Sequence, residues 1–330
     1  VLGQRINVAS VTSAEMIVIG ESLLGRGVIA RIDHALLPAT LYAIFPGSWG
    51  GLHLGGVHLL SALLSATLGA AVFALARSFG VRRPFAAGAA LLACLNPVVV
   101  QIATGLNGVL LMTACAVAML AVLRQPARGG DRSGARAIWV LGALAFASRM
   151  DAVVLVPALL ALLLDADLRS RIWPGTAWAA AIVLLCVPAA FATGLQITAV
   201  GDPGSPGVLH HFSIGLLPGH LAVMVSMAWT RLQPLTPLPF LVGTAAALAR
   251  PGTGRWQILA LSALLIGPYL VYLKPGYFQP QSLLILLPGL GVLSAAWIQD
   301  AWDRTGTWRA RWARPAVGSA FALVAGVACA

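Results

Sequence analysis

Two charged residues interrupt an otherwise apolar stretch of the chain. Residues 137–164 are mostly aliphatic, but Arg149 and Asp151 lie near the middle of this stretch. Charged side chains in such surroundings are costly, and they usually pair with each other or line a polar cavity. An internal ion pair is therefore one interpretation. The other is a contact with a lipid phosphate, because the planar guanidinium of Arg149 can donate to two phosphate oxygens at once.

The first 52 residues contain further side chains that could act as acids, bases or ligands. Ser13 suits the N-cap of a helix over 13–25, and Glu15 then lies in its first turn, where a carboxylate is favourable. Asp33 and His34 precede a second apolar run that Pro38 interrupts. Two interfacial helices joined by a turn explain this pattern without any chemistry. A carboxylate site in this segment is the alternative.

Lys274 and Tyr277 stand together at the end of a later apolar run. An interfacial lysine extends its ammonium toward the headgroups, and tyrosine is common in the aromatic belts of membrane proteins. These two roles explain both residues, and a phosphate contact by Lys274 is the second interpretation. His210 and His211 are adjacent and so do not point to one side of a helix, which argues against a metal site there.

The composition requires a membrane setting for all of these residues. Of the 330 residues, 59% are hydrophobic and 9% are charged, whereas roughly a quarter of a soluble protein is charged. A water-soluble domain is therefore excluded, and the recurring apolar runs predict an all-α, polytopic transmembrane helical bundle. Cys94, Cys115, Cys186 and Cys329 lie within apolar runs without ligand spacing, so we expect them to be small packing residues.

The lengths of the apolar runs predict which segments form helices and which of these cross the membrane. Residues 137–164 are too few for two crossings of about 20 residues each, so they predict a pair of short helices or a re-entrant hairpin. The piece 214–230 is expected to be a helix at the membrane interface. Full spans are predicted over 57–76, 85–103, 105–123, 173–192, 235–249, 256–273, 281–298 and 315–330.

The distribution of charge predicts the orientation. Five connections hold 15 of the 21 basic residues and five of the ten acids, a net charge of +10, which leaves +1 for the rest of the chain. Because cytoplasmic loops are enriched in Lys and Arg, we expect these connections on the inner face. Residues 1–52 then form a first outer-face loop with interfacial helices. Residues 53–330 form the bundle, in which 193–234 is an outer-face loop with an interfacial helix.

Several motifs follow one another in a recognisable order. A helix ending in LL-G-x-G is followed by His34-Ala35-Leu36-Leu37-Pro38, then by an LNP segment within 92–120, an apolar hairpin over 141–164 and a late segment, 276–293. This order resembles the GT-C integral-membrane glycosyltransferases of the protein O-mannosyltransferase and aminoarabinose transferase type, whose turn reads His-Pro-Pro-Leu. The resemblance covers nearly the whole chain.

The resemblance implies a GT-C fold and a reaction. In such enzymes a sugar on a polyprenyl phosphate enters from the bilayer, and the acceptor enters from water at the outer face. A carboxylate of the first outer loop acts as general base or binds a divalent ion, and cations bind the phosphate leaving group. Glu15 and Asp33 would then be catalytic. Substrate-binding residues would be His34, Arg149, Asp151, Lys274 and Tyr277.

The chain also departs from the family pattern. Thr12 and Ser13 stand where the family has an acidic pair, and Asn107-Gly108 replaces a further acid. These departures favour an alternative function, a catalytically silent GT-C-fold subunit with a structural or lipid-binding role in a membrane complex. A transporter fits less well, because the broken hairpin has no counterpart elsewhere in the chain.

Partners and location follow from the same expectations. We expect membrane lipids and a polyprenyl-phosphate-linked sugar as ligands, other membrane subunits as candidate partners, and no nucleic acid. A divalent metal is the one candidate cofactor. The expected location is the bacterial plasma (inner) membrane, with several crossings. Because the chain begins at Val1 and stops within an apolar run, we expect it to be part of a longer protein.

Overall fold

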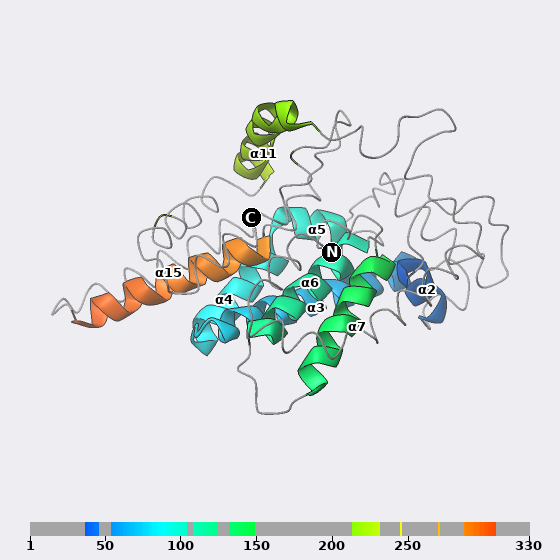
Figure 1. The fold of residues 1–330 in the computed structure, drawn as a ribbon, viewed down its shortest axis with the longest axis horizontal. Coiled ribbons are helices and arrows are strands. Elements are labelled where there is room, and N and C mark those ends of the chain that lie inside the picture. Colours follow the sequence, from blue (N-terminus) through cyan, green and yellow to red (C-terminus); the bar gives the residue numbers. More distant parts are fainter. Residues whose placement is uncertain are drawn as a thin grey trace.

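Most of the described helices pack into a bundle around one long apolar helix. The computed structural model describes residues 37–45, 54–103, 108–124, 132–148, 213–231, 245, 270 and 287–307, and these contain helices and no strand (Figure 1). The all-α fold class predicted from the sequence is thus confirmed. The helices are α2 (Leu37–Ile44), α3 (Leu54–Ser78), α4 (Arg83–Cys94), α5 (Pro97–Ala103), α6 (Gly108–Arg124), α7 (Arg132–Ser148), α11 (Leu217–Arg231) and α15 (Leu287–Thr307), with a 3₁₀ turn, η6 (Ile214–Leu216), before α11.

Helix α3 forms the centre of the bundle. It packs against α4, α5, α6 and α15, and its inward face supplies much of the core through Leu60, Leu64, Leu68 and Val72. Its 25 residues correspond to about 37 Å of helix. Among the described residues, Gly56–Ser78 is the one helical segment that is both long and apolar enough to cross a bilayer by itself. The structure agrees with the span predicted over 57–76.

A tight turn reverses the chain between α3 and α4. Gly80 has a φ of +79°, a left-handed conformation that glycine adopts without strain. The N–H of Gly80 donates to the carbonyl of Arg77, and the N–H of Val81 donates to that of Ala76. These two bonds are the Schellman ending of an α-helix. Helix α4 can therefore begin immediately afterwards and return along α3.

The predicted single span over 85–103 is wrong, because the structure has two helices there. Helix α4 ends at Cys94 and α5 begins at Pro97. Proline disfavours a helical conformation of the residue before it. Asn96 lies at this break and is the N-cap of α5. Its Oδ1 accepts a hydrogen bond from the N–H of Val98 at 2.9 Å. The buried Asn96 therefore starts a new helix instead of continuing the old one.

Small residues allow α4 to approach both α3 and α15 closely. A Cβ built on Gly69 of α3 would lie 2.6 Å from Sγ of Cys94, and one built on Gly291 of α15 would lie 3.1 Å from the carbonyl oxygen of Ala89. A Cβ at either position would force its neighbour to shift, so glycine suits both, and small interfacial residues are typical of helices packed within membranes. Cys94 and Cys115 are free thiols, whereas Cys186 and Cys329 lie outside the described residues.

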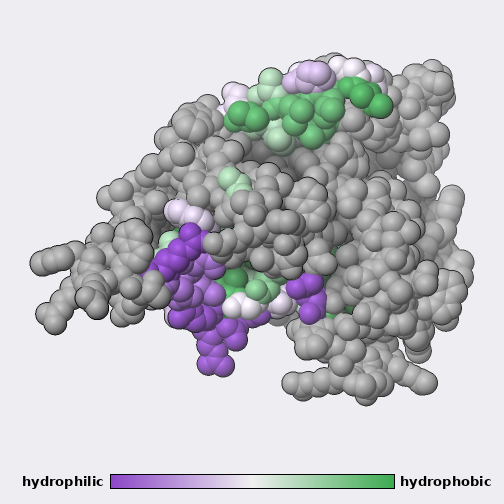
Figure 2. All heavy atoms as spheres, turned by 60° about the vertical axis from the view of Figure 1, so that its left-hand side comes forward, coloured by the Kyte–Doolittle hydropathy of each residue, from purple (hydrophilic) through white to green (hydrophobic). Residues whose placement is uncertain are grey.

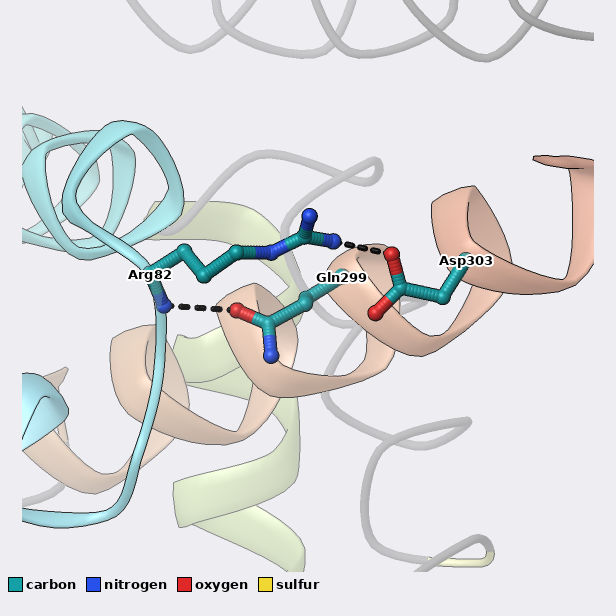
Figure 3. Close-up of polar contacts among 3 residues, drawn as sticks. All are labelled: Arg82, Gln299 and Asp303. Atoms are coloured by element: carbon teal, nitrogen blue, oxygen red, sulfur yellow. Dashed lines mark hydrogen bonds and ion pairs between the residues drawn. The ribbon is translucent and has the colours of Figure 1, made fainter.

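Helix α15 extends beyond the span predicted for it. We expected a span over 281–298 followed by a basic connection, but the described helix continues to Thr307 and includes Asp303. Its polar turns contact the start of α4. The N–H of Arg82 donates to Oε1 of Gln299 at 2.6 Å, and the guanidinium of Arg82 forms an ion pair with Asp303 (Figure 3). The two helices run antiparallel.

Candidate functional site

The predicted site residues lie outside the part of the chain that the structure describes. The structure does describe two helices that adjoin some of these residues in the sequence. Helix α2 begins three residues after His34, and α7 ends at Ser148, directly before Arg149. The predicted site residues in question are Glu15, Asp33, His34, Arg149, Asp151, Lys274 and Tyr277.

The directions of α6 and α7 show at which end of the bundle α2 and the end of α7 lie. Helix α7 begins beside the end of α6, because a Cβ built on Gly134 would lie 3.9 Å from Cγ1 of Val122. It runs back along α6, and α2 contacts α7 (Figure 1). Figure 1 shows α2 at the far end of α7, where Ser148 ends the helix. The segment after His34 and the segment before Arg149 therefore meet.

Apart from Arg231 at the end of α11, the charged residues of the described helices lie at the opposite end of this bundle. Arg77 lies in the last turn of α3, Arg83 begins α4, and the guanidinium of Arg124 at the end of α6 lies 4.5 Å from the ring of Phe79. Asp300, Asp303 and Arg304 lie near the end of α15, beside the start of α4. The described parts of the other end, including all of α2 and α5, contain no Asp, Glu, Lys or Arg. We call these the charged end and the uncharged end.

The uncharged end nevertheless contains buried polar side chains. Asn96 caps α5, as described above, and Ser148 donates its Oγ–H to the carbonyl of Leu144. The hydroxyl of Thr113, five residues into α6, is buried and has no hydrogen-bond partner. Tyr42 of α2 is 1% exposed and is the largest fully buried side chain near this end. None of these was a sequence-based candidate, although the LNP motif already marked Asn96.

A second pair of predicted outer segments is also brought together. Nδ1 of His220, in α11, lies 2.8 Å from the carbonyl oxygen of Leu270 and donates to it. Leu270 precedes Lys274 by four residues. The helix predicted over 214–230 is therefore present as η6 and α11, and it contacts the run that leads to Lys274. Many of its apolar side chains are exposed, including Ile214 and Val225.

A metal site is not formed by the described residues. No group of three His, Cys, Asp or Glu side chains comes together among them. His220 is occupied by Leu270, and His210 and His211 lie outside the described residues. The candidate divalent ion would need ligands from elsewhere in the chain, such as the carboxylates of Glu15 and Asp33.

The described helices form a bundle that contains one apolar helix long enough to cross a bilayer. The family model for dolichyl-phosphate-mannose-protein mannosyltransferase matches residues 30–194, half of the chain. The chain belongs to this family of GT-C membrane glycosyltransferases, as the resemblance of its motifs implied. The matched range includes Asp33, His34, Arg149 and Asp151, whereas Glu15, Lys274 and Tyr277 lie outside it. Comparison with curated proteins gave no match.

Two solved structures show the same fold. The structure of ArnT from Cupriavidus metallidurans bound to undecaprenyl phosphate is similar with a TM-score of 0.62 and 13% identity, and its apo state with a TM-score of 0.57 and 14% identity. Each likeness covers 89% of this chain and 56% of ArnT, so the chain spans little more than half the length of that protein. At this identity the comparison establishes the polytopic GT-C helical fold.

Proposed function

We propose that the protein transfers a sugar from a polyprenyl-phosphate donor to an acceptor at the uncharged end of the bundle. This end would face the outside of the bacterial plasma membrane, because arginine-rich connections remain in the cytoplasm. The observation that carries the proposal is the meeting of α2 and α7 at the end where α2 and α5 contain no Arg, Lys, Asp or Glu. In the sequence these two helices adjoin the predicted carboxylate and the predicted phosphate ligand.

Chain connectivity supports this arrangement. Asp33 precedes Leu37 by four residues, so their Cα atoms are separated by at most roughly 14 Å. Arg149 follows Ser148 directly, which sets their Cα atoms about 3.8 Å apart. Because α2 contacts α7, this connectivity supports a site that contains both the Asp33 carboxylate and the Arg149 guanidinium. A donor with a charged phosphate and a reactive anomeric carbon requires this combination.

In the proposed reaction Glu15 or Asp33 accepts the proton of an acceptor hydroxyl. The hydroxyl oxygen forms a bond to the anomeric carbon, and the bond from that carbon to the phosphate oxygen breaks. Arg149 and Lys274 stabilise the charge on the polyprenyl phosphate that leaves. His34, Asp151 and Tyr277 would contact the substrates. A general base commonly contributes about 10²- to 10⁴-fold to such a rate.

A catalytically silent, lipid-binding subunit is the second candidate. Thr12-Ser13 in place of the family's acidic pair, and Asn107 in place of a further acid, favour it. The ArnT structure contains undecaprenyl phosphate, and a silent relative could keep such a lipid site without performing transfer. The two candidates therefore differ in turnover and agree in lipid binding.

Reconstitution of the full chain in vesicles with a radiolabelled polyprenyl-phosphate sugar would test the proposal. Release of polyprenyl phosphate that requires both the protein and an acceptor is the expected result. Binding of the polyprenyl phosphate without any release, over a panel of sugars and acceptors, would support the silent subunit instead. Adding a chelator to the same assay would show whether turnover requires a divalent ion.

A further inference from the structure

The turn between α3 and α4 gathers arginines from several elements at the charged end. Arg77 lies in the last turn of α3, Arg83 begins α4 and Arg124 ends α6, and the side chains of all three are exposed. Nη1 of Arg77 donates to the carbonyl of Val81 at 2.8 Å, which holds that guanidinium at the turn. The guanidinium of Arg124 lies 4.5 Å from the ring of Phe79, within the same turn. We call Arg77, Arg83 and Arg124 the turn arginines.

Among the described residues, no acid forms an ion pair with Arg77 or Arg83, whereas Arg124 has a further interaction of its own. Asp303 is bound by Arg82, which also lies 5.5 Å from the ring of Phe85. Asp300 has its own interaction within the structure. The side chain of Arg83 has no hydrogen-bond or ion-pair partner among the described residues. Its charge is thus available to a ligand, and the positive end of the α4 helix dipole adds to it.

The position of the turn along the bundle identifies the kind of ligand. The apolar segment Gly56–Ser78 ends beside the turn, which sets the turn arginines at the boundary between hydrocarbon and water. Phe85 and Trp302 pack edge to face near this boundary, with ring centroids 6.3 Å apart, as in an interfacial aromatic belt. Figure 2 shows this end of the molecule, with strongly hydrophilic side chains next to apolar ones. Lipid headgroups lie at this depth.

We propose that the turn arginines bind the headgroup phosphate of an anionic phospholipid. Charge complementarity favours an anionic lipid, because basic residues at a membrane surface attract acidic lipids by about 1 kcal/mol each, or about fivefold in affinity. The planar guanidinium of Arg83 can donate to two phosphate oxygens, while the acyl chains follow the apolar surface of α3. This site is at the opposite end from the proposed donor site and does not depend on sugar transfer.

Native mass spectrometry of the full chain in detergent micelles can measure this binding. Dissociation constants are compared for phosphatidylglycerol and phosphatidylcholine. The parent protein is expected to bind phosphatidylglycerol more tightly. The variant R77Q/R83Q lacks two of the arginines. It should bind phosphatidylglycerol about 25-fold more weakly than the parent and bind phosphatidylcholine equally well. Arg83→Gln alone should weaken it about fivefold, and because Arg83 has no partner among the described residues, this variant should fold normally.

Two control variants separate this site from other sources of affinity. Arg231→Gln removes one positive charge from α11, and it should bind phosphatidylglycerol as the parent does. Arg149→Gln alters the proposed donor site and should also leave the affinity unchanged. Equal affinity of the parent for both lipids, or an unchanged R77Q/R83Q variant, would overturn the proposal. Loss of binding in Arg149→Gln, or equally strong competition by inorganic phosphate, would overturn it as well.

Discussion

Arg82 holds two successive turns of α15 at once. Its guanidinium forms an ion pair with Asp303, and its backbone N–H donates to Gln299 one turn earlier. The two contacts join residues more than two hundred positions apart and align the start of α4 with the polar end of α15 (Figure 3). These two contacts join α4 and α15 at the charged end of the bundle.

This ion pair should contribute little to stability. The side chains of Arg82 and Asp303 are 49% and 52% exposed, and exposed pairs typically contribute about 0.2–1 kcal/mol. Asp303→Asn should therefore lower the free energy of unfolding in detergent by no more than about 1 kcal/mol. A double-mutant cycle with Arg82→Gln measures the coupling directly. A coupling of several kcal/mol would show that the pair is shielded from water, contrary to this account.

The contact between Gly69 and Cys94 predicts a non-additive pair of substitutions. Gly69→Ala places a methyl group 2.6 Å from Sγ of Cys94, and such overpacking costs about 1–3 kcal/mol. Cys94→Ala removes the sulfur, so the double variant should recover most of the stability that Gly69→Ala loses. Denaturant titration of the purified variants would measure this. Gly219→Ala is the matched control, because no atom lies within 4 Å of its new Cβ. Simple addition of the two single effects would contradict the close approach of α3 and α4.

The N-cap of α5 predicts a graded series at one position. Asn96→Ala removes the acceptor for the N–H of Val98 and should cost about 0.5–2 kcal/mol of stability. Asn96→Ser keeps an oxygen that can accept this bond, so it should be clearly milder. Thermal unfolding in detergent distinguishes them. Equal losses for both variants would mean that the buried amide acts by some means other than capping.

Apolar length and charge predict much of the bundle from the sequence. The spans over 57–76 and 105–123 correspond to α3 and α6 because each is a continuous apolar run bounded by arginine or glycine. The break at Asn96 was missed, since Val98 and its neighbours are as apolar as the span before them. A capping side chain and a proline decide that break locally, and an average over hydropathy does not detect them.

The contacts between distant elements could not be predicted. Helices α15 and α4 approach closely where Gly291 faces the backbone of Ala89. Nothing in the local sequence of either helix specifies this partner. Hydropathy also predicts the end of α15 too early, because its last turns are polar and yet remain helical beside the start of α4. The predicted site residues lie outside the described residues, so their roles remain predictions.

The orientation of the bundle can be tested by labelling. In a cysteine-free background, Arg83→Cys should react with membrane-permeant reagents only, because the charged end faces the cytoplasm. Ile44 of α2 is 61% exposed. A cysteine at this position should react with impermeant reagents added to intact cells. A cysteine at position 130, between α6 and α7, should behave like the one at 83. Labelling of positions 83 and 130 from outside would invert the topology.

The most direct test of sugar transfer at the uncharged end is the rate of Glu15→Gln and Asp33→Asn, each assayed separately on the full chain with a polyprenyl-phosphate sugar. Loss of the general base should lower the rate of one of them by about 10²- to 10⁴-fold while expression and polyprenyl-phosphate binding stay at the parent level. Full activity in both variants would contradict the account, because neither carboxylate would then serve the reaction.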